Sequence, residues 1–319
     1  MPNPKKIIVS EEASNQRLDV FLADKLKITR SQVQKMITKD LVLINEKLPK
    51  KAGDNLSADD NITFKKETAK SDVPTKKDAN KKSTSKLPEP KIITETPDYI
   101  VVEKPTGMLS HPTMAGETDT LADFITNKFP EVKKVGEDPA RPGIVHRLDR
   151  EASGLMVVAR TQKMFVHLKE QFKNRTIEKE YTALVHDPVA RNWGEINFPI
   201  ARSETSARMA ALPSQAGNDA KEAKTEFLVE EQFVNFSLLK VKIHTGRMHQ
   251  IRVHFLAYDH PLVGDPLYFQ KKQKRHWDEK LGRLFLHSTK LGFTDLEGVK
   301  QTFESPLPKE LKNFLKEIK

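Results

Sequence analysis

One acidic residue, Asp149, stands out because three basic side chains crowd around it in the sequence: His146, Arg147 and Arg150. A short apolar pair precedes the cluster and a continuous apolar run follows it, which predicts a strand, a loop and a buried strand. Loops on such a scaffold often carry reactive groups, because the flanking backbone fixes a side chain that stays accessible. An isolated Asp between strands often only caps its own turn. Here the neighbouring cations favour a carboxylate used for chemistry.

Other kinds of site find little support in the sequence. His244, His249 and His254 recur at spacings of five, which places successive side chains about 140° apart on a helix and on opposite faces of a strand. We therefore expect no metal site and interpret these histidines as structural hydrogen-bonding groups or nucleic-acid contacts. The chain has no Gly-rich phosphate loop, no dinucleotide fingerprint and no Gly-x-Ser-x-Gly elbow. It has no cysteine, which excludes disulfides, iron–sulfur ligation and thiol nucleophiles.

Length and charge set broad limits on the function. The 319 residues suffice for two domains and a linker. A net charge of +10 favours a polyanionic partner, although many soluble proteins without one carry as much. No apolar run approaches the roughly 18 residues of a membrane span, and the N-terminus lacks the apolar core of a signal peptide. We therefore expect a soluble, cytoplasmic protein that has no membrane partner.

Residues 14–64 predict a small α+β domain. Apolar residues recur at helical spacing between Ser14 and Leu26, with Ser14 as the expected N-cap, and Thr29-Arg30-Ser31-Gln32 is a capping-box pattern that begins a second helix. Short strands are expected near Val42 and Ile62. Residues 65–91 contain nine lysines, three prolines and almost no large apolar side chain, so we interpret them as a flexible basic linker.

Residues 92–319 predict a second, larger domain. The sequence indicates strands at 99–102 and 179–185, a hairpin at 225–243, and helices after Thr120 and over 161–175. The stretch 191–217 is interpreted as irregular. Because strands outnumber helices and hairpins dominate, we expect an α+β fold with a mixed, largely antiparallel sheet and flanking helices.

The motifs of this second domain, taken together and in order, resemble those of a known enzyme family. They are Lys104-Pro105-Thr106-Gly107, His146-Arg147-Leu148-Asp149 with Ser153-Gly154-Leu155, Lys179-Glu180-Tyr181, the run from Thr245 to His254, the run from His260 to Tyr268, and Leu286-His287-Ser288. The combination resembles RNA pseudouridine synthases of the RluA/RluD type. The resemblance spans nearly all of residues 92–315 and implies the pseudouridine synthase fold. One departure is Ala152, where the family often has Thr.

The first domain resembles the alpha-L RNA-binding motif of ribosomal-protein type, a common partner of that family. The likeness is carried by residues 16–22, 29–37 and 42–45. In that motif the second helix and the following turn face RNA phosphates, and the corresponding side chains here are Arg30, Gln34, Lys35, Lys39 and Lys47. The alternative is that these side chains are simply the solvated face of a small helix.

The resemblance implies a chemistry for Asp149. The C1′–N1 glycosidic bond of an RNA uridine is cut, the base is turned and it is rejoined through C5. A carboxylate suits this reaction because C1′ becomes electron-poor as the bond breaks. Asp149 would attack C1′ or remove the 2′ proton, and the sequence does not choose between them. No electrons or groups pass to a third molecule, so we expect no cofactor, and in particular no nucleotide cofactor.

By the same resemblance, Arg252 pairs with Asp149 and keeps it ionised, with Arg247 as the less favoured candidate. Tyr181 would stack on the target base and relay the C5 proton late in the reaction, or is an ordinary strand aromatic. His146 and Arg147 would contact phosphate or the displaced strand, because a base inside a helix must be flipped out before C1′ can be reached.

Three interpretations of the function stay open. The first is an enzyme that modifies structured RNA, with large-subunit ribosomal RNA as the expected substrate. The second is a noncatalytic ribosome- or RNA-binding protein that keeps the same scaffold. The third is a pseudouridine synthase that acts on transfer RNA. We expect a monomer in each case.

Overall fold

The computed structural model divides the chain into two compact units, residues 1–82 and 83–319. The following residues are described: 6–26, 30–38, 41–49, 51, 53–64, 88–113, 116–203, 208–212, 220–270 and 275–319. Residues 65–87 of the expected linker (residues 65–91) lie outside these ranges, and Lys91 belongs to a strand.

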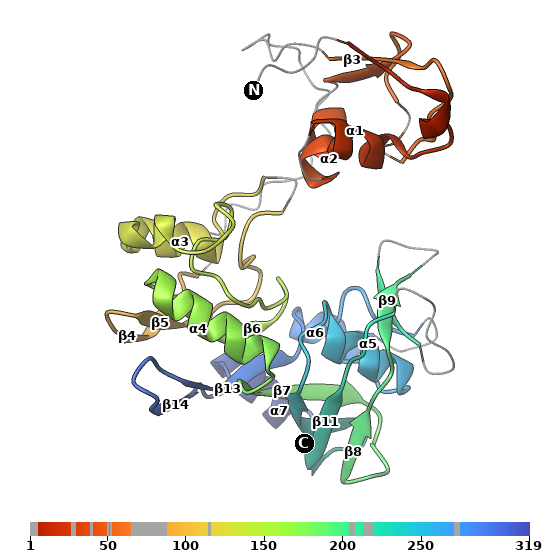
Figure 1. The fold of residues 1–319 in the computed structure, drawn as a ribbon. Coiled ribbons are helices and arrows are strands. Elements are labelled where there is room, and N and C mark those ends of the chain that lie inside the picture. Colours follow the sequence, from red (N-terminus) through yellow and green to blue (C-terminus); the bar gives the residue numbers. More distant parts are fainter. Residues whose placement is uncertain are drawn as a thin grey trace. The chain divides into compact units, whose positions relative to one another are not determined.

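The first unit packs two helices against a three-stranded antiparallel sheet (Figure 1). The helices are α1 (Leu18–Leu26) and α2 (Arg30–Thr38), preceded by the short helix η1 (Glu11–Ala13). The strand order is β1 (Lys6–Ile8), β3 (Asn61–Phe64) and β2 (Val42–Ile44). The core of this unit is small and consists of the buried side chains of Val9, Leu18, Phe21, Leu22, Val33, Ile37, Val42, Leu56 and Ile62.

The expected start of the first helix is wrong. Ser14 is not an N-cap, because it directly follows η1 and its backbone N–H donates to the carbonyl of Glu11. Helix α1 begins only at Leu18, whose N–H donates to the carbonyl of Asp54. The capping box expected at Thr29 lies outside the described residues.

The second unit is built on one large mixed sheet. Its strand order is β4, β5, β6, β13, β7, β12, β11, β8, and β14 also pairs with β13. The bounds are β4 Lys91–Glu95, β5 Tyr99–Lys104, β6 Ser153–Ala159, β7 Glu178–His186, β8 Trp193–Ile196, β11 Thr225–Gln232, β12 Phe236–Ile243, β13 Leu286–Thr294 and β14 Lys300–Glu304. The pairing of β6 with β13 is parallel, and the other pairings in this sheet are antiparallel.

Helices flank this sheet, which confirms the expected α+β class (Figure 1). They are α3 (Leu121–Lys128), the short helix η2 (Pro130–Lys134), α4 (Gln162–Lys173), α5 (Gln250–Ala257), α6 (His276–Leu281) and α7 (Lys309–Glu317). Thr120 forms the expected capping box with Asp123 at the start of α3, and Thr161 caps α4. None of the helices in the described part of the chain combines the length and apolarity needed to cross a bilayer.

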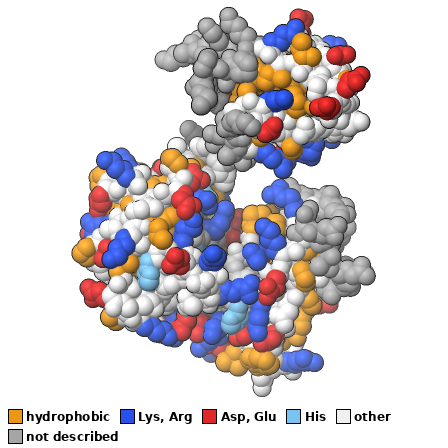
Figure 2. Space-filling view, in the orientation of Figure 1, with side chains coloured by type: hydrophobic (Ala, Val, Ile, Leu, Met, Phe, Trp, Pro, Cys, Tyr) orange, Lys and Arg blue, Asp and Glu red, His pale blue; other side chains and the backbone are white. Residues whose placement is uncertain are grey.

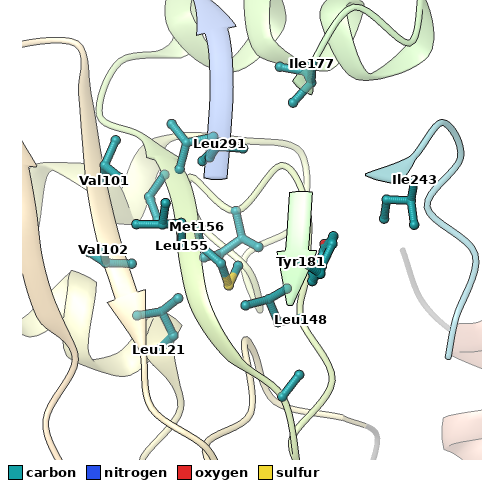
Figure 3. Packing of buried hydrophobic residues seen from close by; sticks show 14 of the residues in the cluster. Val101, Val102, Leu121, Leu148, Leu155, Met156, Ile177, Tyr181, Ile243 and Leu291 are labelled. Atoms are coloured by element: carbon teal, nitrogen blue, oxygen red, sulfur yellow. The ribbon is translucent and has the colours of Figure 1, made fainter. Parts of the chain in front are cut away.

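The centre of the sheet forms the main core. Val101 and Val102 of β5 and Leu155 and Met156 of β6 belong to the same buried cluster as Leu291 of β13 (Figure 3). Gly154 lets the two parallel strands approach closely, because its φ is 118° and an added Cβ would lie 2.4 Å from the carbonyl oxygen of Ser288. This close contact fixes β6 directly after the loop that carries Asp149.

The stretch interpreted as irregular contains regular structure. Strand β8 pairs with β11, and β9 (Ile200–Arg202) pairs with β10 (Met209–Ala211) in a separate two-stranded ribbon. These strands have three or four residues each. A stretch this short holds too few alternations to give a period-2 signal, and the strands form because they pair with neighbours.

Candidate active site

The loop before β6 carries Asp149 and is held by buried polar contacts. Lys104, at the end of β5, is fully buried and its Nζ donates to the backbone carbonyls of Pro105, Met108 and Ala152 at 2.7 to 2.9 Å. Three acceptors match the three protons of an ammonium group. Burial lowers the pKa of Lys104 to about 7, against the nearby charge of Asp149. Lys104 therefore ties the turn after β5 to the loop of Asp149.

A second contact fixes the residue before Asp149. The hydroxyl of Ser110 donates to the carbonyl of Leu148 at 3.1 Å and accepts the N–H of Leu148 at 3.2 Å. Leu148 itself is buried in the main core, near Tyr181 (Figure 3). Ser110 thus fixes the backbone of the residue that precedes Asp149.

Asp149 and Arg252 form the ion pair that the family resemblance implied. Arg252 Nη1 lies 3.1 Å from Asp149 Oδ2 and 3.0 Å from Glu151 Oε2. The Arg252 side chain, on α5, is fully buried, whereas that of Asp149 is 14% exposed. Arg247 is not the partner: its Nε donates to the carbonyl of Glu222. The cation is buried and the carboxylate reaches a cavity, as a reactive carboxylate would need.

Asp265 holds the other side of the same guanidinium. It accepts from Arg252 Nε at 2.7 Å and from Nη2 at 2.8 Å, a bidentate arrangement between two fully buried groups. Burial disfavours the charge of Arg252, but the hydrogen bonds and charge of Asp265, with smaller effects of Asp149 and Glu151, raise its pKa above the ordinary value. Arg252 is therefore a permanent, fixed cation.

Tyr181 lies on β7 beside the same cavity. Its side chain is 6% exposed and packs in the core near Ile243 and Leu148 (Figure 3). Burial, together with the charge of Asp149, raises the pKa of its phenol well above the ordinary value, although a hydrogen bond with Ser288 acts in the opposite direction. The phenol is therefore protonated at neutral pH and can donate or relay a proton.

Asp149, Tyr181 and Arg252 line one cavity of about 110 Å³. Its lining also includes His249 and Arg147. A site of this kind can bring a carboxylate, a fixed cation and an aromatic ring to one flat ligand. Among the described residues, no group of three or more His, Asp or Glu side chains is arranged to hold a metal ion.

A larger basic groove of about 510 Å³ continues from this cavity, with Arg147, Tyr181, Ile243, Gly246 and Arg247 in both linings. Its cationic side chains are Arg141, Arg147, Lys173, Arg175, Lys179 and Arg247. Figure 2 shows Lys and Arg side chains gathered on the second unit between the part that carries α4 and the part that carries α5. The groove suits a polyanionic chain that delivers one unit into the smaller cavity.

The environment of His146 argues against the charged phosphate contact that was expected of it. Its Nε2 accepts the backbone N–H of Val157 at 3.0 Å, and its ring stacks on Phe172 with the centroids 4.9 Å apart. Burial lowers its pKa to about 3, with a smaller effect of Lys179, so the ring is neutral. A charged contact from His146 to phosphate is thus disfavoured, whereas Arg147 is exposed in the groove.

Two of the expected RNA contacts of the first unit are partly engaged within the protein. The carboxylate of buried Asp19 accepts from Arg17, Arg30 and Gln34, each at 3.0 Å. The hydrogen bond from Arg17 is the largest cause that lowers the pKa of Asp19. Burial acts in the opposite direction, and the hydrogen bonds from Arg30 and Gln34 lower the pKa further. Arg30 remains 56% exposed. Arg30 and Gln34 therefore belong to a polar network with a structural role, and their expected contact with RNA remains a prediction.

The other expected contacts of this unit are less defined. Lys47 is exposed in the turn after β2. The side chain of Lys35 and all of Lys39 lie outside the described residues. The RNA-facing roles of these three lysines remain predictions.

Sequence reasoning missed several residues of the site. Asp265 and Tyr268 stood within the motifs that carried the family resemblance but received no role, and Glu151 was treated as part of the loop. Lys104 also stood within one of these motifs and received no role, since a fully buried lysine is rare and leaves no local signal. Its position just after an apolar strand and before Pro105 was the one available hint.

Family models match both units. Residues 98–257 match the RNA pseudouridylate synthase family, and residues 16–62 match the S4 domain. The fold and the site therefore define an RNA-modifying enzyme of the pseudouridine synthase class with an N-terminal S4 domain.

Individual relatives define the family of this chain more closely. The chain is 32% identical to the uncharacterized RNA pseudouridine synthase YlyB of Bacillus subtilis, over 99% of each chain. It is 32% identical to the ribosomal large subunit pseudouridine synthase D of Neisseria meningitidis serogroup B, over 97% of this chain and 80% of the relative. A structure of human RNA pseudouridylate synthase domain containing 1 matches with a TM-score of 0.57 at 26% identity, covering 69% of this chain and 84% of that chain. The chain belongs to the RNA pseudouridine synthase family, of the RluA/RluD type.

Proposed function

We propose that this chain isomerises specific uridines of large-subunit ribosomal RNA to pseudouridine. Two relatives, from Nitrosomonas europaea and Neisseria meningitidis, are named ribosomal large subunit pseudouridine synthases, which supports this substrate over transfer RNA. The basic groove beside the cavity supports a structured, polyanionic substrate rather than a free nucleoside. The RNA is held by the groove while one everted uridine enters the cavity.

Asp149 is the reactive group in this proposal. The C1′–N1 bond breaks as Asp149 attacks C1′ or removes the 2′ proton, and the uracil turns within the cavity. The C1′–C5 bond then forms as the ester bond between Asp149 and C1′ breaks or, on the second route, as the 2′ proton returns to C2′. The C5 proton leaves to solvent and N1 gains a proton, so atoms balance without a cofactor. The 3.1 Å contact with Arg252 supports an ionised carboxylate at the start of the reaction.

Tyr181 acts in the late steps of the reaction, in which the C5 proton leaves the base. Its ring borders the same cavity as Asp149, which suits stacking on the uracil. Because its phenol is protonated at neutral pH, Tyr181 takes up the C5 proton only as it passes its own proton on, and it acts as a relay rather than as a resting base.

The observation that carries the proposal is the pairing of a partly exposed Asp149 with a fully buried Arg252 at the wall of a cavity. Ribosomal RNA labelled with tritium at uridine C5 tests it. We expect tritium release to water with no loss of base from the RNA. Release of free uracil would indicate a glycosidase, and binding without release would indicate a noncatalytic RNA-binding protein.

A further inference from the structure

His249 has an unusual backbone conformation at the wall of the cavity. It immediately precedes α5 with φ 56° and ψ 23°, the left-handed region that residues other than Gly adopt uncommonly, Asn, Asp and His more often than the rest. Such strain costs on the order of 1 kcal/mol and persists where the surroundings enforce it. In this conformation the imidazole lines the cavity, with Nε2 4.0 Å from Asp149 Oδ1.

The hydrogen bonds of Tyr268 define which ring nitrogen of His249 carries the proton. Tyr268 is buried, and its hydroxyl oxygen accepts the backbone N–H of Met209 at 3.1 Å and lies 2.7 Å from His249 Nδ1. Within the described part of the chain, Nδ1 is the one acceptor in contact with the hydroxyl proton. A buried donor without an acceptor costs roughly 1–3 kcal/mol. The hydroxyl therefore donates to Nδ1, and Nε2 carries the proton.

The same network holds Tyr268 in place. Asp265 Oδ1 accepts from Arg252 Nη2 at 2.8 Å and from the backbone N–H of Tyr268 at 3.0 Å. The Arg252 guanidinium also lies 5.1 Å from the centre of the Tyr268 ring. Arg252 and His249 thus approach opposite oxygens of Asp149, and Asp265 and Tyr268 connect them from behind.

His249 is neutral in this setting. Burial lowers its pKa, and the charge of Arg252 acts in the same direction, while Asp149, Glu151 and Asp265 act against it. At neutral pH the ring therefore presents an N–H dipole to Asp149 rather than a second cation. This leaves Arg252 as the charged partner of the carboxylate.

We propose that His249 is a positioning residue: held as the Nε2–H tautomer by Tyr268, it donates to Asp149 Oδ1 when the nucleotide enters and fixes the rotation of the carboxylate toward the ribose. The 4.0 Å separation closes to hydrogen-bond distance in the loaded site, since catalytic hydrogen bonds are commonly longer in the free enzyme. This inference rests on the proposed role of Asp149 and adds the group that orients it.

Three variants at one position test the kinetic part. Gln places a side-chain N–H near the position of Nε2, Asn favours the same left-handed backbone but is too short, and Ala has no donor. We expect His249→Ala and His249→Asn to lower the single-turnover rate of tritium release by about 10- to 100-fold with unchanged RNA affinity. His249→Gln should recover at least about a third of the wild-type rate.

Two results would overturn the inference. One is wild-type rates in all three variants. The other is a loss of rate that follows the melting temperature alone, with Gln no better than Asn, because that pattern indicates a structural role. If wild-type protein itself releases no tritium, the proposed function fails instead. A measurement of the His249 tautomer then still tests whether Tyr268 donates to Nδ1.

The tautomer can be measured without turnover. In protein labelled with ¹⁵N-histidine, long-range ¹H–¹⁵N spectra should assign a protonated Nε2 and a bare Nδ1 to the signal that disappears in His249→Gln. Tyr268→Phe removes the donor to Nδ1, and we expect that signal to shift toward a mixture of tautomers. A wild-type His249 protonated at Nδ1 contradicts the inference.

Discussion

Asp265 accepts two hydrogen bonds from Arg252, at Nε and Nη2, and thereby leaves Nη1 as the nitrogen that faces Asp149. The two residues are both fully buried. A bidentate contact fixes the plane of the guanidinium as well as its position. The geometry of the Asp149 carboxylate therefore depends on a second carboxylate, which is fully buried.

This arrangement predicts a stability effect at Asp265. Removing one partner of a buried ion pair leaves an uncompensated charge, which costs about 3–5 kcal/mol. We expect Asp265→Ala to lower the free energy of unfolding by about that amount in urea titrations. Glu317→Ala is the matched control: it removes one partner of the exposed pair between Lys280 and Glu317 and should cost less than about 1 kcal/mol. Equal effects would show that Asp265 has no special role.

The groove predicts a graded loss of RNA affinity. Arg147 and Lys173 are exposed cations of its lining. Each phosphate contact contributes about 0.7–0.9 to the slope of log affinity against log salt. We expect Arg147→Gln with Lys173→Gln to weaken binding and reduce that slope by about 1.5. Lys312→Gln, an exposed lysine of α7, should leave the slope unchanged, and an equal change there would assign the effect to net charge alone.

The first unit predicts a separable contribution to binding. Because Lys91 begins β4, a truncation that spares the catalytic sheet removes residues 1–87. We expect the shortened protein to bind ribosomal RNA more weakly and with less salt sensitivity, yet to keep some tritium release. A truncated protein with the same salt titration as the full chain would show that the S4 domain does not contact the substrate.

His146 predicts a pH effect on stability. Its pKa is about 3 in the folded protein, against about 6.5 when unfolded. The unfolded chain therefore binds more protons between these values, so stability falls as pH decreases from 6.5 toward 3. At pH 5 the loss is about 2 kcal/mol, from about 1.36 kcal/mol for each pKa unit.

A neutral replacement checks this assignment. In His146→Gln the amide oxygen can accept the Val157 N–H, but the side chain does not titrate. We expect the difference in unfolding free energy between pH 7 and pH 5 to be about 2 kcal/mol smaller in this variant than in the wild type. An unchanged pH dependence would mean that other groups account for acid sensitivity.

Local signals predicted the parts of the fold that local interactions determine. The capping pair Thr120 and Asp123, and Thr161 before an amphipathic run, gave helices within a few residues of α3 and α4. The strands β9 and β10 escaped prediction because they hold three residues each and depend on pairing with one another. Ser14 was wrongly predicted as the N-cap of the first helix, because the short helix η1 ends there and α1 begins only at Leu18.

The family resemblance predicted one long-range contact that the structure shows, the ion pair between Asp149 and Arg252. Arg252 lies 103 positions from Asp149, and no spacing rule links them. Asp265, Lys104 and Tyr268 received no role because their functions consist of tertiary contacts with buried partners. His249 was interpreted as a structural hydrogen-bonding group or a nucleic-acid contact, and its left-handed backbone could not be predicted from the sequence.

The most direct measurement compares Asp149→Asn with wild-type protein in the tritium-release assay on ribosomal RNA, with RNA binding measured in parallel. The amide is nearly the same size but is neither a nucleophile nor a base, so we expect release to fall at least about a thousandfold while affinity changes less than about threefold. Glu297→Gln, in an exposed turn, should behave as wild type. Tritium release that persists in Asp149→Asn would contradict the account.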